Sequence, residues 1–144
     1  MSIDTINVWH KRARPEPTER DFNTQLGCHF EEIAEMVETL TFNTQPGADT
    51  ALYNNLLVVA TLLKQGKRKA TINDREGFLD ALADQIVTAT GTGYCAGMQM
   101  PAAVDEVNRS NFSKFDHNGQ PVRDENGKIK KGEHYSPPNL KGMF

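Results

Sequence analysis

Three carboxylates lie within five residues of one another, at Glu31, Glu32 and Glu35. In a helix, side chains three and four residues apart share a face, so the oxygens of these groups can converge on one point. Like charges at this spacing repel each other unless a cation lies between them. The cluster therefore has two interpretations, a solvated acidic face or a binding site for a divalent cation.

A second acidic pair follows at Asp80 and Asp84, one helical turn apart. Carboxylate oxygens without cysteine or histidine favour Mg²⁺ or Mn²⁺ over zinc or copper. Mg²⁺ held by a few carboxylates usually completes its shell with water and phosphate oxygens. The two acidic groups together predict a Mg²⁺ site, with Mn²⁺ as an alternative, that serves phosphate-ester or phosphoanhydride chemistry.

The elements expected to position these groups are helices, because apolar residues recur at helical spacing between capping residues and prolines. We expect a short helix through Trp9 that ends before Pro15, a long helix from about Thr18 to Phe42, a third capped by Asp49 or Thr50, a fourth capped by Asn73 or Asp74, and a fifth from about Pro101. The expected buried stripes are Leu26, Phe30, Ile33, Val37 and Leu40 on the second helix and Leu79, Leu82, Ala83, Ile86 and Thr90 on the fourth.

These patterns predict an all-α fold, a four- to five-helix bundle with a helical core over about residues 2–115. With 144 residues, 38% of them hydrophobic, the chain is expected to form a single domain over residues 1–144 with Trp9 as a core anchor. Residues 116–144 are polar and rich in Gly and Pro, which predicts a mostly irregular extension. Residues 121–129 predict a small hairpin around Asn126 and Gly127.

The formal net charge of −3 gives no basic field that would attract nucleic acid or an anionic membrane surface. No apolar run approaches the roughly 20 residues of a membrane span. The first residues lack the apolar core of a signal peptide, so the expected location is the cytoplasm.

Glu32-x-x-Glu35, followed by an acidic pair on a later helix, resembles the Glu-x-x-Glu … Glu-x-x-Asp pattern of the all-α nucleoside triphosphate pyrophosphatases. This superfamily includes the MazG-like, dimeric dUTPase and phosphoribosyl-ATP pyrophosphohydrolase enzymes. The resemblance spans about residues 20–115 and is closest to small MazG-like proteins, whose later segments look like residues 107–114, 127–132 and 137–140 here. One position departs from the pattern: Ala81 lies three residues before Asp84, and the carboxylate is Asp80, four before.

The resemblance implies hydrolysis of a (deoxy)nucleoside triphosphate between the α and β phosphates, giving the monophosphate and pyrophosphate. The implied cellular role is the removal of unwanted nucleotides from the nucleotide pool. The resemblance further implies Mg²⁺ at Glu32, Glu35, Asp80 and Asp84, with Glu31 or Glu32 accepting a proton from the attacking water. The residues alone do not choose between these two bases.

The resemblance also implies that the polar side chains of Asn108, Arg109, Asn111 and Lys114 contact the nucleotide. Asn108, Asn111 and Lys114 share a helix face, whereas Phe112 and Phe115 are expected to anchor the segment to the core. Together with the small residues from Ala89 to Gly93, it predicts a homodimer or homotetramer. Two other functions stay open, phosphoribosyl-ATP hydrolysis and a non-catalytic helical interaction module.

Overall fold

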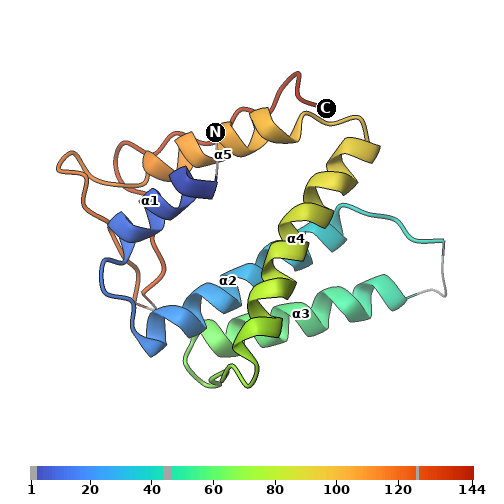
Figure 1. Cartoon of the computed structure of the whole chain (residues 1–144), viewed down its shortest axis with the longest axis horizontal. Coiled ribbons are helices and arrows are strands. Elements are labelled where there is room, and N and C mark those ends of the chain that lie inside the picture. Colours follow the sequence, from blue (N-terminus) through green and yellow to red (C-terminus); the bar gives the residue numbers. More distant parts are fainter. Residues whose placement is uncertain (1–2, 44–46, 126) are drawn as a thin grey trace. The chain divides into compact units, whose positions relative to one another are not determined.

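The computed structural model describes residues 3–43, 47–125 and 127–144. The described residues form five helices and no strand: α1 (Ile3–Ala13), α2 (Glu19–Glu38), α3 (Ala48–Lys64), α4 (Arg75–Cys95) and α5 (Met100–Phe112) (Figure 1). The all-α fold class is therefore confirmed. Within these ranges, none of the helices has the length and apolar content needed to cross a membrane.

The chain forms two compact units. Unit 1 consists of residues 1–15, 71–122 and 129–144, and unit 2 consists of residues 16–70 and 123–128. Unit 1 thus contains α1, α4, α5 and most of the C-terminal extension, whereas unit 2 contains α2, α3 and a short loop from that extension. The single domain over residues 1–144 stays a prediction, because it depends on how the two units are arranged.

Two helix starts are fixed by the side chains that the sequence predicted. The Thr18 hydroxyl accepts a hydrogen bond from the Asp21 amide at 3.1 Å, and the Asp21 carboxylate accepts one from the Thr18 amide at 3.0 Å. This reciprocal capping box satisfies backbone donors at the start of α2. The Asp74 carboxylate likewise accepts from the Gly77 amide at 3.0 Å and caps α4.

Two predicted boundaries are wrong. The N-cap of α3 is Gly47, with a left-handed φ of 89°, and not Asp49 or Thr50, which lie inside the helix. α2 ends at Glu38 and not near Phe42, because Thr39 caps it and no burial favours its extension. The side chain of Phe42 is 41% exposed.

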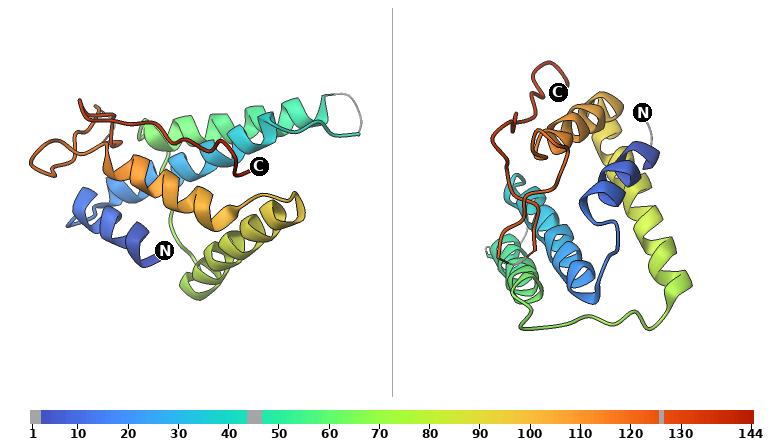
Figure 2. Two further views of the ribbon diagram at one scale, coloured as in Figure 1. Left: turned by 90° about the horizontal axis from the view of Figure 1, so that it is seen from above. Right: turned by 90° about the vertical axis from the view of Figure 1, so that its left-hand side faces the viewer.

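Unit 2 is organised by the antiparallel pair α2 and α3, which lie side by side in Figure 1 and in both views of Figure 2. The two backbones come close at Gly27, where an added Cβ would lie 2.8 Å from the Ala60 carbonyl oxygen and 2.8 Å from Lys64 Cγ. Two small side chains of this helix pair, Ala34 on α2 and Ala60 on α3, are buried. The expected stripe on α2 is confirmed at Val37, which is buried, and in part at Leu26, Phe30 and Ile33, which are half-buried, but Leu40 is exposed.

Unit 1 has its core where α1 and α5 meet the extension. Trp9, Ala13, Phe115 and Ile129 are buried together, and Phe112 packs against them. The Trp9 and Phe115 rings stack with centroids 5.5 Å apart, and Trp9 Nε1 donates to the Asn111 carbonyl oxygen at 2.7 Å. Trp9, Phe112 and Phe115 therefore anchor the core as predicted.

The buried stripe predicted on α4 is wrong. Leu79 and Ile86 are 69% and 50% exposed, Ala83 and Thr90 are exposed, and Leu82 is half-buried. α4 contacts α5 within unit 1, but Gly93, close to the Met100 side chain, is its one buried residue among those described. Among the described residues of unit 1, most of the apolar stripe therefore has no neighbouring helix to pack against.

The close approach at Gly27 predicts a clear mutational result. Gly27→Ala places a methyl group against the α3 backbone, so we expect it to lower the free energy of unfolding by about 1–3 kcal/mol. Gln25→Ala, on the exposed face of the same helix, should change it by less than about 0.5 kcal/mol. Urea unfolding followed by circular dichroism measures both values. Equal stability of the two variants would contradict close packing of α2 on α3.

Candidate functional site

The acidic cluster lies on α2, in unit 2. Glu32 and Glu35 are exposed, whereas Ala34 between them is fully buried. The packing of α2 on α3 therefore turns these two carboxylates outward, one helical turn apart, as the sequence predicted. The exposed side chain of Glu35 can meet a ligand from solvent.

Glu31 differs from its neighbours because its carboxylate makes two ion pairs. Lys64 Nζ at the end of α3 donates to Oε1 at 2.5 Å, and Lys128 Nζ donates to Oε2 at 3.0 Å. Burial alone favours the neutral carboxyl group, but the hydrogen bonds and positive charges of the two lysines outweigh it, so the pKa of Glu31 lies below its ordinary value. Glu31 is therefore ionised and holds two cations.

Lys128 reaches Glu31 from a loop that further hydrogen bonds and an ion pair hold in place. The Arg123 guanidinium donates to the Asp21 carboxylate on α2 at 3.2 Å and to the Gly127 carbonyl oxygen at 3.0 Å. Within the loop, the Asp124 amide donates to the Lys128 carbonyl oxygen and the Asp124 carboxylate accepts from the Lys128 amide, each at 2.9 Å. These contacts lie where the sequence predicted a small hairpin. The described residues on either side form no strands, and the predicted turn residue Asn126 lies outside the described residues.

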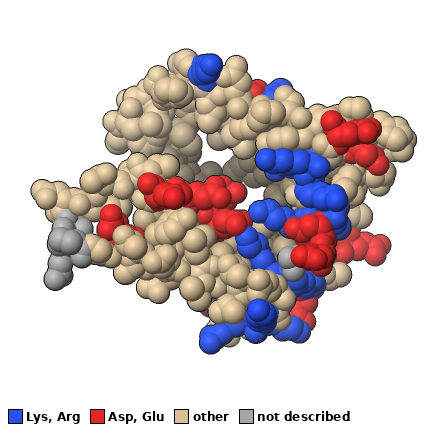
Figure 3. Space-filling view, turned by 180° about the vertical axis from the view of Figure 1, so that it is seen from behind, with Lys and Arg blue, Asp and Glu red and all other residues tan. Residues whose placement is uncertain are grey.

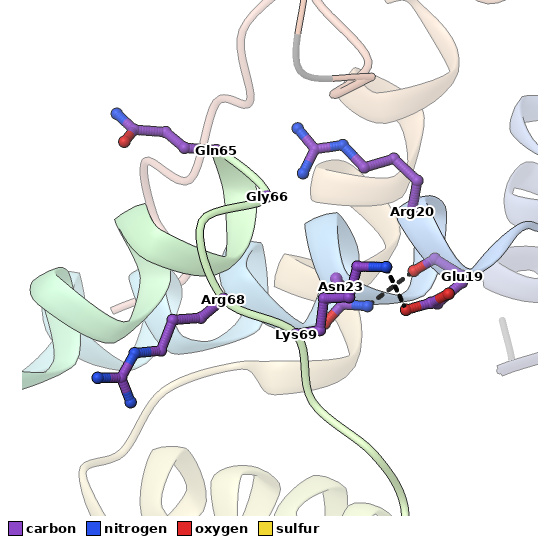
Figure 4. A pocket seen from close by; sticks show the side chains of 7 residues that line it. All are labelled: Glu19, Arg20, Asn23, Gln65, Gly66, Arg68 and Lys69. Carbon is purple, nitrogen blue, oxygen red and sulfur yellow. Dashed lines mark hydrogen bonds and ion pairs between the residues drawn. The ribbon is translucent and has the colours of Figure 1, made fainter.

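A cavity of about 290 Å³ lies where α2 begins and α3 ends, the same end of the helix pair as Lys64 (Figure 4). It is lined by Glu19, Arg20, Asn23, Gln65, Gly66, Arg68 and Lys69. The Arg20 guanidinium donates to the carbonyl oxygens of Leu63 and Lys64 at 3.3 and 2.5 Å and so satisfies the end of α3. In Figure 4 the side chain of Lys69 is joined to Glu19, an ion pair of 3.1 Å, while Arg68 points away from it.

Polar groups of this cavity hold the loop after α3 against α2. Asn23 is 2% exposed, and its side-chain oxygen accepts from the Ala70 amide at 2.7 Å while its nitrogen donates to the Glu19 carbonyl oxygen at 2.9 Å. Two of the three cations in the lining, Arg20 and Lys69, thus have partners within the protein. The polar groups around the cavity hold the loop in place, and their charges do not converge on one point.

The second acidic pair lies on α4, in unit 1. Asp80 and Asp84 are both exposed and one turn apart, so they can act on one ligand. Their convergence with Glu32 and Glu35 depends on the arrangement of the two units and stays a prediction. Among residues 3–43, 47–125 and 127–144, no three His, Cys, Asp or Glu side chains form a group that could hold a metal ion.

The predicted nucleotide-contacting residues lie on and just after α5, in unit 1. Asn108 is buried, at 4% exposure. Arg109 forms a two-pronged ion pair with Glu106, at 2.8 and 2.9 Å, and donates to the Pro137 carbonyl oxygen at 3.0 Å. Lys114 Nζ donates to the Asn111 side-chain oxygen at 2.7 Å, so these two predicted residues lie together.

The ion pair of Arg109 belongs to a larger set of contacts that hold residues 136–143 along α5. The Asn139 amide donates to Glu106 at 2.8 Å, and the Ser136 amide donates to the Ser113 hydroxyl at 2.8 Å. At the other end of α5, the Gln99 amide donates to the Met143 carbonyl oxygen at 2.8 Å. In Figure 1 the extension follows α5 along its length. We call residues 136–143 the tail strap.

Lys64 and Lys128 could not be predicted from the sequence as partners of Glu31. They are 33 and 97 residues away from it in the chain, and a lysine near the C-terminus of a helix, such as Lys64, is already explained by the helix dipole. The one available signal was that Lys128 lies in the segment 127–132 that carries part of the family resemblance.

The Glu106–Arg109 pair predicts a titration that can be measured. The hydrogen bonds from Arg109 and from the Asn139 amide lower the pKa of Glu106 from 4.5 to about 2. Because the folded-state pKa is the lower one, this stabilisation is complete above pH 4.5 and is lost as the pH falls through about 2. Carbon-13 NMR of the Glu106 carboxyl should give a midpoint near 2, which Arg109→Met should raise toward 4.5 and Lys141→Met should not change. A midpoint of 4.5 in the unaltered chain would contradict the pairing.

The chain was compared with protein-family models, with curated proteins and with solved structures, and none of the three comparisons gave a match. The similarity to the all-α nucleoside triphosphate pyrophosphatases therefore rests on the motif residues of the sequence. Their predicted roles as metal ligands, bases and nucleotide contacts stay predictions.

Proposed function

We propose that the chain is a Mg²⁺-dependent nucleoside triphosphate pyrophosphohydrolase of the all-α type that converts (deoxy)nucleoside triphosphates to monophosphates and pyrophosphate. The observation that carries this proposal is the outer face of α2, where two exposed carboxylates, Glu32 and Glu35, lie beside an ionised Glu31 that already holds two lysines. Such a surface offers oxygen ligands for a metal and positive charge for phosphates in one place.

The residues on α2 fit a hard divalent cation. Glu32 and Glu35 offer carboxylate oxygens one turn apart, and their exposure leaves room for water and phosphate oxygens around a Mg²⁺ or Mn²⁺ ion. Asp80 and Asp84 of unit 1 are the further ligands that the motif implies. The chemistry that the bound ion supplies is neutralisation of phosphate charge and a lower pKa for the attacking water.

The ion pairs of Glu31 bear on which carboxylate accepts the proton of that water. Both oxygens of Glu31 accept hydrogen bonds from lysines, and its pKa is lowered, so it is a weak base as long as the lysines stay. In the absence of ligand Glu32 is therefore the stronger candidate for the general base, whereas Glu31 becomes a candidate once its lysines have moved to another anion. On unit 1, Asn108, Arg109, Asn111 and Lys114 would contact the nucleotide after exchanging their present partners.

Removing one carboxylate tests the metal site. Glu35→Gln keeps the size of the side chain but removes its charge, so we expect pyrophosphate release with saturating Mg²⁺ to fall by at least about 100-fold, since even residues that only support metal ligands often cost up to that factor. Glu38→Gln removes an exposed charge at the end of the same helix and should keep full activity. Circular dichroism checks that both variants stay helical. Full turnover by Glu35→Gln would contradict its role as a metal ligand.

A screen of common and modified deoxynucleoside triphosphates, together with phosphoribosyl-ATP, identifies the substrate. Pyrophosphate release from a triphosphate but not from phosphoribosyl-ATP is expected, because the segments 107–114 and 127–132 resemble the MazG-like proteins more closely. The reverse preference would assign the chain to histidine biosynthesis instead.

A second candidate function is a non-catalytic helical interaction module. It is favoured by α4, where Leu79, Ile86, Val87 and Tyr94 are between 50% and 81% exposed. Exposed apolar side chains in such number on one helix mark a surface that another chain can cover. Metal-dependent release of pyrophosphate from any nucleotide separates the two candidates, because only the enzyme shows it.

The same helix supports the proposal of a homodimer or homotetramer. Apart from its chain neighbours and the adjacent backbone of α4, an added Cβ at Gly91 would meet no described atom within 4 Å, so Gly91→Ala should not disturb the chain itself. If a second copy packs on the small residues near Gly91, this variant should weaken the oligomer, whereas Gln85→Ala should not. Light scattering over a range of concentrations measures both. A monomeric, active wild-type chain would contradict the oligomer.

A further inference from the structure

Two ammonium groups converge on one carboxylate in unit 2. Lys64 comes from the end of α3, Lys128 from the loop of residues 123–128, and Glu31 from α2, so three separate segments meet at this point. Each lysine takes a different oxygen of Glu31. The three side chains carry a net charge of one positive unit, because one carboxylate neutralises only one of the two lysines.

The backbone positions of both lysines are fixed without Glu31. The end of α3 is held by the close packing at Gly27 and by Arg20, which donates to the Lys64 carbonyl oxygen at 2.5 Å. The loop that carries Lys128 is held on α2 by Arg123, which pairs with Asp21 at 3.2 Å. The two ammonium groups can therefore leave Glu31 while the segments that carry them stay in place.

The side chains are also accessible enough to exchange partners. The Lys64, Glu31 and Lys128 side chains are 18%, 22% and 44% exposed, so solvent and a ligand reach the group. Figure 3 shows that basic side chains gather in groups at the surface close to acidic ones. A phosphoryl group presents neighbouring anionic oxygens much as a carboxylate does, and it carries more negative charge.

We infer that Lys64 and Lys128 form a phosphate-binding pair, which Glu31 occupies in the absence of ligand and which a triphosphate takes over from it. This inference rests on the proposed function and deepens it, because it assigns the polyphosphate contacts that a metal on Glu32 and Glu35 leaves open. Lysine suits this role because its ammonium group is a compact charge with three donors that can turn from one anion to another. Glu31 then acts as an internal competitor that keeps the two lysines together.

The test uses inorganic tripolyphosphate, a probe without base or sugar, and the full chain with excess EDTA, so that neither turnover nor bound metal contributes. Isothermal titration calorimetry gives the dissociation constant. We expect Lys64→Gln and Lys128→Gln each to weaken binding by about tenfold, the effect of losing one charge-assisted hydrogen bond. Lys67→Gln and Lys130→Gln remove exposed lysines that make no contact with Glu31, and they should change binding by less than about twofold.

Glu31→Gln distinguishes a phosphate-binding pair from a purely structural tie. It removes the competing charge and leaves both lysines, so we expect tripolyphosphate to bind severalfold more tightly to this variant. A structural tie predicts weaker or unchanged binding, because its loss can only loosen the loop. Unchanged or weaker binding by Glu31→Gln, or equal affinities for all four lysine variants, would overturn the inference.

Nitrogen-15 NMR of the lysine ammonium groups tests the wild-type chain and does not depend on the folding of any variant. The Nζ signals of Lys64 and Lys128 should shift when tripolyphosphate is added, and that of Lys67 should not. Absence of these shifts at saturating probe would also overturn the inference. Binding by the lysine pair without pyrophosphate release from any nucleotide would keep the phosphate site and reject the hydrolase, so the two proposals fail separately.

Discussion

The contact on which the arrangement of unit 2 depends is the approach of α2 to α3 at Gly27. With no side chain there, the helix backbones come close enough for Ala60 and Leu63 to be buried. This distance brings Lys64 within reach of Glu31. A larger residue at position 27 would separate the helices, so one glycine determines whether this ion pair can form, whereas the helical period places Glu32 and Glu35 on the outer face.

Local signals in the sequence predicted much of the helical framework. Thr18 and Asp74 cap α2 and α4 because a side-chain oxygen next to free backbone amides acts over three residues, a range that a sequence pattern captures. Trp9 and Phe115 were predicted as core anchors, Phe115 because it lies off the helix face that Asn108, Asn111 and Lys114 share. By contrast, Gly47 caps α3 through a left-handed backbone angle. A sequence pattern does not show this angle, and the common capping residues Asp49 and Thr50 nearby led to the wrong prediction.

Contacts between distant parts of the chain could not be predicted, because a sequence pattern covers only a few neighbouring residues. The stripe on α4 has the correct spacing, but spacing does not tell which helix, if any, covers it, and Leu79 is 69% exposed. The acidic positions of the candidate site follow from the sequence, since Glu32, Glu35, Asp80 and Asp84 are recognised by residue type and helical period. The partners of Glu31 do not follow, because they come from distant segments that only the folded chain brings together.

The core of unit 1 also determines the order in which the chain can fold. Trp9 packs on Phe115 and Ile129, so the first helix has no complete core until residue 129 has been synthesised. The α2–α3 pair needs only residues 16–70 for its helix contacts and can form while the ribosome is still adding α4 and α5. During translation, Trp9 and the apolar side of α1 stay exposed over more than a hundred residues of elongation. The N-terminal helix therefore waits for the C-terminal extension before its tryptophan is covered.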